Sequence, residues 1–424
     1  MKHVAILLDG KIKNDGRVRH TIESLSDWHK VDLYCVGSEN DYQSLFNKNV
    51  KVIHYKMNLN WININLRMDK KFKGLRKSYL KNKNNNDFSC VVLTILESKT
   101  DFDNAVKKET FSKFLLRSIK IRYKQCLYAR EFETVIVRRE LLFQNDYGNL
   151  FMEKFLLKIH PNVILDFDDD ISAAKNQPKK ITNFYGKLLL EDGDKFNNTL
   201  KLYNRFIVAS NYLKQKVLAE NPNILEENIL VIPTCVDYNQ YQIKKYPQKI
   251  EQIVFGWIGG DHNYFLLDSL LPVLNKLAKD YDFKLIVIGG KKYEPNVNFE
   301  IEFITWTLAT EVENLYKIDI GLMPLNDDAR SRGKGGFKLI QYMGLGIVSV
   351  ASAITINREI ISHNYDSFLY DNEQELIAIL EAILANKILL SKVGYRARQK
   401  IEHNYTFKSV QESYINFICQ NNSL

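Results

Sequence analysis

The sequence predicts an α/β protein with two doubly wound, Rossmann-like parallel-sheet domains that face a central cleft. The chain has 424 residues, more than one ordinary hydrophobic core accommodates. It opens with an apolar run at His3–Leu8, an amphipathic stretch at Val18–Trp28 and a second apolar run at Val31–Val36. This strand–helix–strand order is typical of a parallel sheet. The same alternation restarts after a polar stretch at Asp237–Lys249, which we expect to be the interdomain linker.

The remaining elements follow the same pattern in both halves of the chain. In the first half, further strands are expected at Val135–Val137, Val163–Leu165, Phe206–Val208 and Val231–Pro233. In the second half, strands are expected at Ile253–Trp257, Phe283–Ile288, Phe303–Trp306, Ile320–Met323 and Ile347–Ala351. Helices are expected there at Tyr264–Lys279, Thr310–Ile318, Lys338–Gly344, Asn357–Ser362, Glu373–Asn386 and Ser391–His403. We therefore expect domains at residues 1–235 and 236–404, with the tail at about 405–424 joining the first.

Composition indicates a folded protein of the cytoplasm. Hydrophobic residues make up 45% of the chain, and no apolar run reaches the length of about 18 residues that a membrane span needs. The N-terminus lacks the long apolar stretch and cleavage site of a signal peptide, so export is not expected. The five cysteines are scattered and form no C-x-x-C pair, which argues against a disulfide framework and a structural zinc site.

The formal net charge of +9 indicates an anionic partner, such as nucleic acid, a phospholipid surface or a phosphorylated substrate. No nucleic-acid-binding motif is visible, so we expect no nucleic acid partner. A dinucleotide-dependent oxidoreductase would need Gly-x-Gly-x-x-Gly after the first strand, but only Gly10 and Gly16 occur there.

The most informative segment is a glycine-rich loop between a strand and a helix. The apolar run Asp319–Leu325 is followed by a polar loop and then by Gly333-Lys334-Gly335-Gly336-Phe337-Lys338, after which an apolar helix face begins. Glycines allow close backbone approach to a ligand, and a helix N-terminus offers unpaired N–H groups and a positive dipole end. Together with the lysines this pattern is typical of a phosphate-binding site, although it is not a Walker A motif. A flexible glycine loop with solvated basic residues is the alternative interpretation.

The residues Gly333–Gly346 (GKGGFKLIQYMGLG) resemble the donor-binding signature of retaining glycosyltransferase family 4 and its GT-B relatives. The resemblance extends to other segments in the same order. They are Asn14–Val18, Val135–Glu140 (VIVRRE), Leu165–Asp170 (LDFDDD), Val231–Asp237, Phe255–Gly260 and Leu285–Gly290.

The resemblance implies a GT-B fold and a glycosyltransferase of the hexosyltransferase type. Such an enzyme moves a sugar from a nucleoside-diphosphate sugar, with UDP favoured by family frequency, to a glycan or lipid-linked acceptor in bacterial surface polysaccharide or glycoconjugate synthesis. Retention of configuration and independence from cofactors and divalent metal ions are implied in the same way. A homo-oligomer is left open. The alternative is a catalytically inactive, GT-B-shaped accessory or glycan-binding subunit.

The resemblance also assigns roles to residues of the second domain. Many relatives carry Arg and Lys near the first glycine loop of this domain, but the corresponding loop here, Trp257–His262, has neither. We therefore expect Lys334 and Lys338, with Arg332, to stabilise the leaving diphosphate as negative charge develops on it. The expected donor-binding residues are Gly259, Gly260, Gly290, Trp306, Arg332, Gly335, Gly336, Phe337 and Gln341. The family usually carries a Glu-x7-Glu pair, and the corresponding positions here are Gly333 and Gln341. Gln341 can still hydrogen-bond a hydroxyl group, but it brings no negative charge.

In the first domain, the acidic cluster Asp166–Asp170 follows a strand. The cluster could hold a metal ion as a D-x-D motif does, orient the acceptor hydroxyl or donor sugar, or form a solvated acidic turn. Within it we expect Asp168 to be catalytic, since strand alternation places it on the same side as Asp166 and nearer the cleft. The acceptor side of the cleft would also contain Gly16, Arg17 and Arg138.

A basic region at about residues 56–130 interrupts the first domain. It contains two segments, 67–83 and 111–130, in which Lys and Arg alternate with aromatic and aliphatic residues. Such segments can dock on an anionic membrane, which would place the protein on the inner face of the plasma membrane. An ordinary solvated helix surface is the alternative.

Overall fold

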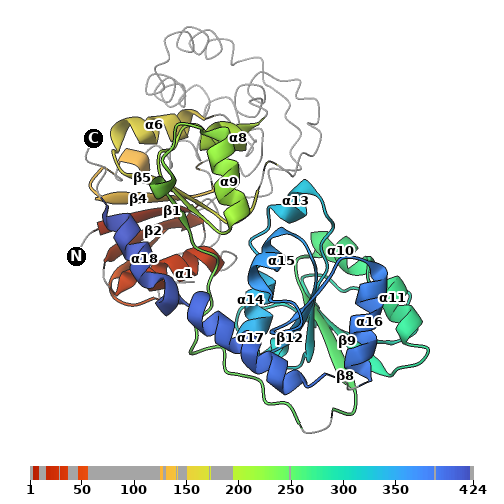
Figure 1. The fold of residues 1–424 in the computed structure, drawn as a ribbon. Coiled ribbons are helices and arrows are strands. Elements are labelled where there is room, and N and C mark those ends of the chain that lie inside the picture. Colours follow the sequence, from red (N-terminus) through yellow and green to blue (C-terminus); the bar gives the residue numbers. More distant parts are fainter. Residues whose placement is uncertain are drawn as a thin grey trace, which may run out of the picture. The chain divides into compact units, whose positions relative to one another are not determined.

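The computed structural model describes residues 3–8, 16–27, 29–36, 46–55, 125–127, 130–139, 141, 150–170, 172, 194–247, 250–385 and 388–420. The chain divides into two compact units (Figure 1). The first comprises Met1–Ile232 together with Ser413–Leu424, and the second comprises Pro233–Glu412. Each unit has its own sheet and hydrophobic core. Most of the basic region at 56–130, and with it the membrane-docking hypothesis, lies outside the described residues.

The first unit is built on a seven-stranded sheet in the order β3-β2-β1-β4-β5-β6-β7. Its strands are β1 (His3–Leu8), β2 (Lys30–Val36), β3 (Val50–Tyr55), β4 (Thr134–Arg138), β5 (Val163–Phe167), β6 (Phe206–Val208) and β7 (Ile229–Val231). All neighbouring pairs are parallel. The near-continuous apolar runs of β1, β4 and β5 fit a sheet whose central strands are buried on both faces.

Helices complete the first unit. They are α1 (Gly16–Ser26), α6 (Phe151–Ile159), α8 (Lys195–Leu200), α9 (Asn211–Glu220), the short 3-10 helix Glu226–Asn228 and α18 (Phe407–Cys419). The C-terminal part of α18 belongs to this unit, because Tyr414, Phe417 and Ile418 are buried. The Tyr414 hydroxyl lies 3.1 Å from Thr21 Oγ1 on α1.

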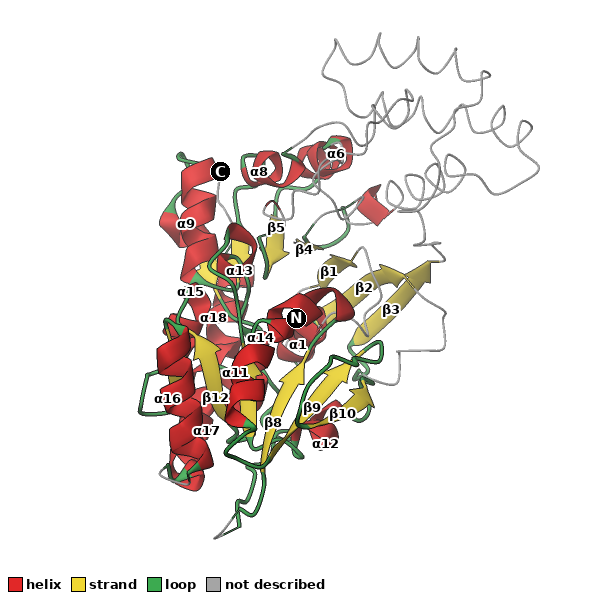
Figure 2. Cartoon of the chain, turned by 90° about the vertical axis from the view of Figure 1, so that its right-hand side faces the viewer, coloured by secondary structure: helices red, strands yellow, loops and turns green. Residues whose placement is uncertain are grey.

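The second unit has a six-stranded sheet in the order β10-β9-β8-β11-β12-β13. Its strands are β8 (Ile253–Ile258), β9 (Phe283–Gly289), β10 (Glu300–Thr305), β11 (Ile320–Met323), β12 (Val348–Ser352) and β13 (Phe368–Tyr370). Every neighbouring pair is again parallel, and Figure 2 shows β8, β9 and β10 running in one direction. The strand order reverses direction between β8 and β11, which is where doubly wound sheets bind ligands.

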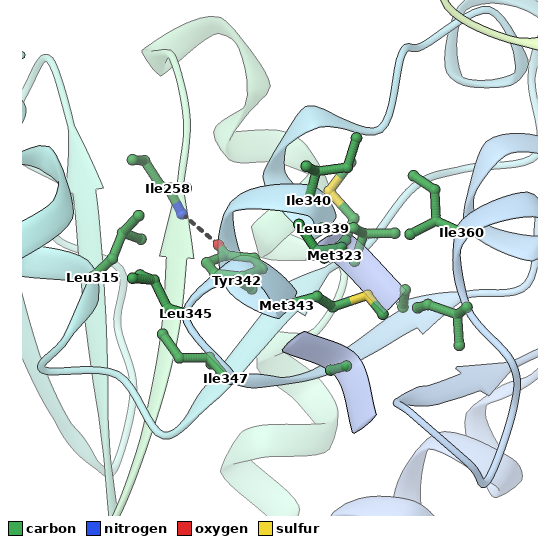
Figure 3. Packing of buried hydrophobic residues seen from close by; sticks show 14 of the residues in the cluster. Ile258, Leu315, Met323, Leu339, Ile340, Tyr342, Met343, Leu345, Ile347 and Ile360 are labelled. Carbon is green, nitrogen blue, oxygen red and sulfur yellow. Dashed lines mark hydrogen bonds between the residues drawn. The ribbon is translucent and has the colours of Figure 1, made fainter. Parts of the chain in front are cut away.

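The helices of the second unit cover both faces of this sheet. They are α10 (Tyr264–Asp268), α11 (Leu271–Leu277), α12 (Glu311–Leu315), α13 (Ala329–Arg332), α14 (Phe337–Gly344), α15 (Thr355–Ile360), α16 (Glu373–Leu384) and α17 (Leu390–Asn404), with a short 3-10 helix at Asp261–Asn263. Helix α14 packs at the centre of one core cluster (Figure 3). Its Tyr342 hydroxyl accepts the backbone N–H of Ile258 at 3.0 Å. The Tyr342 ring covers Gly321, where a Cβ atom would lie 2.4 Å from the ring, so glycine is required there.

The expected architecture of two parallel, doubly wound α/β units is confirmed, while some local details differ from expectation. The stretch at 237–247, within the expected linker Asp237–Lys249, packs on the second unit: Tyr241 is buried, and Lys244 Nζ lies 2.7 Å from Asp319 Oδ1. The single helix expected at Tyr264–Lys279 is two helices, since Pro272 begins a new one. In the described part of the chain, no helix has the length and apolar character needed to cross a membrane.

Candidate functional site

The candidate site of the second unit lies at the carboxyl edge of its sheet. Gly259 and Gly260 directly follow β8, Gly290 follows β9 and Trp306 follows β10. β11 leads into the loop before α14. Because all these strands are parallel, their carboxyl ends meet at one edge. The fold therefore brings most of the residues expected to bind the donor to the same edge.

The N-terminus of α14 presents open backbone donors at this edge. Gly336 is its N-cap residue, with φ of +69°, a conformation that glycine adopts without strain. A Cβ atom there would also lie 2.5 Å from Ile360. Among the described residues, no hydrogen-bond acceptor is recorded for the N–H groups of Gly335 and Gly336. Such unpaired donors at a helix start are suited to bind an anion.

Lys338 is the cation at the centre of this arrangement. Its Nζ lies 4.1 Å from the ring centroid of Trp257, at the end of β8. The backbone of Gly259 closes over the pair: a Cβ atom at this position would lie 2.4 Å from the Trp257 ring and 2.6 Å from Lys338 Nζ. Burial, with a smaller contribution from Lys334, lowers the pKa of Lys338 from 10.5 to about 7. Among the described residues, no carboxylate forms an ion pair with it.

Further positive charge surrounds Asn263. The Asn263 side-chain oxygen accepts from Arg330 Nη2 at 3.3 Å and from Lys334 Nζ at 3.5 Å. Partial burial and the charges of Arg330, Lys334 and Lys338 lower the pKa of the neighbouring His262, so its imidazole is neutral at neutral pH. Like charges gathered in this way repel each other, and an anionic ligand would relieve that repulsion.

Asp261 holds the loop after β9 in place. Its Oδ1 accepts the backbone N–H groups of Gly290 and Lys291, both at 2.9 Å. A Cβ atom at Gly290 would lie 2.7 Å from the same oxygen, so glycine permits this close approach. Gly290 therefore lies in a turn that the hydrogen bonds to Asp261 fix beside the carboxyl ends of β8 and β9.

Trp306 and Gln341 meet at a carboxylate that the sequence analysis did not identify. Glu311 Oε2 accepts the Trp306 indole N–H at 2.5 Å, and Glu311 Oε1 accepts from Gln341 Nε2 at 2.8 Å. Gln341 is 3% exposed, and its Nε2 also donates to the Tyr241 hydroxyl at 3.2 Å. A carboxylate of α12 therefore lies within hydrogen-bond distance of the Gln341 amide.

Two other expected donor residues have different surroundings. Arg332 forms a two-point ion pair with the exposed Asp327, at 2.7 and 3.0 Å, whereas Arg330 and Lys334 both donate to Asn263. Phe337 is half-buried and packs against the core cluster around α14.

In the first unit, the expected acceptor residues form a buried charge network. Arg17 Nε lies 2.6 Å from Asp166 Oδ1, and Arg17 Nη1 donates to the backbone oxygen of Ile232 at 2.6 Å. Arg17 follows Gly16, the first residue of α1, and both charged side chains are at most 3% exposed. Burial raises the pKa of the Asp166 carboxyl although Arg17 opposes this.

Asp168 lies between two arginines. Arg138 Nη2 is 2.6 Å and Arg139 Nη2 is 2.8 Å from its Oδ1. Burial alone would raise the pKa of Asp168, but these guanidinium groups outweigh burial and hold the pKa well below its usual range. Arg139 has a left-handed backbone with φ of +62°, a strained conformation that is common near functional sites. Asp168 is therefore a fixed anion that can orient hydroxyl groups but cannot carry a proton at neutral pH.

Three residues of the second-unit site were missed: Trp257, Asn263 and Glu311. The sequence pattern indicates an ordinary strand core residue at Trp257 and a polar turn at Asn263. Glu311 follows Trp306 by five positions, so only the fold of the β10–α12 connection brings them together. No group of three or more potential metal-ligating side chains occurs within the ranges that the structure describes.

Comparison with known proteins supports this location. Residues 252–386, most of the second unit, match the family model "Glycosyl transferases group 1". No curated protein matches the chain by sequence.

Solved structures are similar over the whole chain. HepE of Anabaena in complex with UDP and glucose has a TM-score of 0.60 at 11% identity, covering 98% of this chain and 99% of that one. A glycosyltransferase from Rickettsia africae has a TM-score of 0.61 at 14% identity, covering 99% of both chains. Sucrose-phosphate synthase of Thermosynechococcus elongatus has a TM-score of 0.61 at 10% identity, covering 98% of both chains. The chain therefore has the GT-B fold, and residues 252–386 of its second unit match the group 1 glycosyltransferase model.

Proposed function

We propose that this protein is a glycosyltransferase that moves a sugar from a nucleoside-diphosphate sugar, with UDP as the favoured nucleotide, to a hydroxyl group of a glycan or lipid-linked acceptor. The observation that carries the proposal is the N-terminal end of α14, where one short segment supplies both the Lys338 ammonium and the open amides of Gly335 and Gly336. The group 1 domain match includes this site. The structural relative HepE was solved with UDP-glucose, which supports UDP as the nucleotide.

The proposed chemistry follows from the charges at this edge. The bond between the anomeric carbon and the β-phosphate oxygen breaks, and the nucleoside diphosphate leaves with the electron pair. The acceptor hydroxyl oxygen forms the new bond to the anomeric carbon, and its proton passes to the departing diphosphate. Lys338, Lys334 and the two amides offset the negative charge that develops on the leaving phosphate. Because these groups are oriented before the reaction, the proposal includes no divalent metal ion and no other cofactor.

Retention of the anomeric configuration is part of the proposal through the resemblance of Gly333–Gly346 to the family 4 signature. In the first unit, Asp168 is suited to orient an acceptor or donor hydroxyl, because its charge is fixed by Arg138 and Arg139. A role in bacterial surface polysaccharide or glycoconjugate synthesis agrees with relatives such as the lipopolysaccharide outer core galactosyltransferase WaaB. We place the protein in the cytoplasm, near the membrane when the acceptor is lipid-linked.

A donor screen tests this proposal. Thermal shifts with UDP-, GDP-, dTDP- and CMP-linked sugars identify the nucleotide, and slow release of the nucleoside diphosphate from that donor shows turnover. NMR analysis of the product then gives the anomeric configuration, and EDTA tests the independence from metal. Stabilisation by one donor without any release or transfer would favour the alternative, an inactive glycan-binding or accessory subunit. No stabilisation by any donor would contradict the proposed function.

A further inference from the structure

We infer that Trp257 is a positioning residue for Lys338: its buried indole ring holds the ammonium group at the mouth of the α14 anion site in place of a protein carboxylate. The functional consequence rests on the proposed function, since the anion would be the donor diphosphate. The placement of the ammonium by the ring is independent of which anion binds.

The geometry is that of a close cation–π contact. Lys338 Nζ lies 4.1 Å from the Trp257 ring centroid, well inside the distance of about 6 Å at which such contacts stabilise a cation. Trp257 is fully buried, and its ring also contacts Tyr264 at a centroid distance of 5.6 Å. A rigid ring with a negative face therefore defines where the flexible lysine side chain ends.

Gly259 completes the enclosure. Its backbone lies so close to the ring and the ammonium that a Cβ atom would overlap both. The ammonium thus lies between an aromatic face and a main-chain segment, and little space remains for other rotamers. The Lys338 side chain therefore loses its conformational entropy when the protein folds, and little more is lost when a ligand binds.

The charges that face Lys338 explain why an aromatic ring suits this position. Lys334 precedes it in the same loop, Arg330 approaches from α13, and His262 lies on the 3-10 helix after β8. All three are cationic or neutral, and the nearby Asp261 is engaged with the backbone of Gly290 and Lys291. A carboxylate partner would neutralise the site, whereas an aromatic ring stabilises the ammonium and leaves its charge for an incoming anion.

The cation–π contact also predicts how the pKa of Lys338 depends on the Trp257 ring. Burial lowers the pKa of Lys338 to about 7, and the ring opposes this by favouring the charged form. Removing the ring while keeping the position apolar should therefore lower the pKa further. On the scale of cation–π contacts, the shift should be about one unit.

The experiment measures the titration of Lys338 directly in the full-length protein. NMR of lysine labelled with ¹³C at the ε position reports protonation, and Lys338→Met identifies the signal. Trp257→Leu should move the midpoint to lower pH by about one unit, and Trp257→Phe, which keeps an aromatic face, should restore most of the wild-type value. Phe255→Leu is the matched control: Phe255 is equally buried on the same strand and contacts Phe283, so it should leave the midpoint unchanged.

Binding of UDP-glucose provides the functional measurement, because its diphosphate has no group that titrates near neutral pH. Wild-type affinity should fall as the pH rises through the Lys338 midpoint, and Trp257→Leu should bind roughly tenfold more weakly at neutral pH. In a Lys338→Met background, Trp257→Leu should have no further effect. An unchanged or raised midpoint in Trp257→Leu would overturn the inference, even if the donor binds. Failure of the wild type to bind any nucleotide sugar would contradict only the proposed function, since the titration does not depend on it.

Discussion

The side-chain amide of Gln341 donates to Oε1 of Glu311 at 2.8 Å, so a neutral residue of α14 positions a carboxylate that α12 supplies. Trp306 fixes the other carboxylate oxygen through its indole N–H. This arrangement explains why position 341 is an amide in this chain. A glutamate there would place a second carboxylate within hydrogen-bond distance of Glu311.

Gln341→Glu should therefore impair the site although it restores the acid that is usual at this position in the resembling family. Two carboxylates about 3 Å apart cannot both be ionised at little cost, so one must take up a proton or move away. We expect a loss of about 1–3 kcal/mol in the free energy of unfolding and weaker donor binding. Chemical denaturation and calorimetric titration with the donor measure the two effects.

The charge-swapped double variant is the control. Glu311→Gln combined with Gln341→Glu exchanges the amide and the carboxylate and keeps one negative charge, so it should recover most of the stability that Gln341→Glu loses. If the double variant were no more stable than Gln341→Glu, repulsion from Glu311 would not be the cause.

Lys338→Met should stabilise the protein while it slows transfer of the sugar. The pKa of Lys338 is lowered from 10.5 to about 7, so the unfolded chain binds more protons between these values and stability rises with pH across that window. Removing the amine removes the cost of burying its charge. The free energy of unfolding should therefore rise by about 0.5–2 kcal/mol near neutral pH, and this gain should fade as the pH approaches 10.5. Transfer should slow on the order of a hundredfold or more, because one stabilising contact to the leaving group is lost.

Thermal unfolding over a pH series measures the change in stability, and turnover of the donor measures the loss of transfer. Lys392→Met, on the exposed face of α17, is the matched control and should change neither by much. A Lys338→Met variant that turned over donor at the wild-type rate would contradict the role of this lysine in catalysis.

Gly259→Ala should weaken donor binding roughly tenfold through displacement of Lys338. The new methyl group would lie 2.4 Å from the Trp257 ring and 2.6 Å from Lys338 Nζ. The ring is fixed in the core, so the ammonium is the group that moves away. At Gly260, a methyl group would instead approach only the exposed His262 ring, at 2.8 Å, which can rotate. Donor titrations of both variants should show a clear loss for Gly259→Ala alone, and equal effects would contradict this account of the packing.

The sequence was sufficient to predict the fold class because the apolar runs of the parallel strands are nearly continuous, as in β4, β5 and β12. The glycine loop before α14 was recognisable because its glycines and lysines are consecutive. Contacts between residues distant in the sequence were not predictable in the same way. Trp257 and Lys338 are 81 positions apart and meet only because β8 ends and α14 begins at the same edge of the sheet. Residues 237–247 look like a linker because they are polar, yet Tyr241 and Lys244 anchor them to the second unit.

Asp166→Asn tests whether the buried contact with Arg17 in the first unit is an ion pair. The two side chains are at most 3% exposed and 2.6 Å apart. If the carboxyl is ionised, the substitution leaves the Arg17 guanidinium buried without a counter-ion and should cost about 3–5 kcal/mol. The exposed pair of Arg358 and Asp371 is the control, and Asp371→Asn should cost less than about 1 kcal/mol. Urea denaturation followed by circular dichroism measures both. Because burial raises the pKa of Asp166, a cost near zero for Asp166→Asn would instead mean that the carboxyl is protonated and already acts as a neutral partner of Arg17.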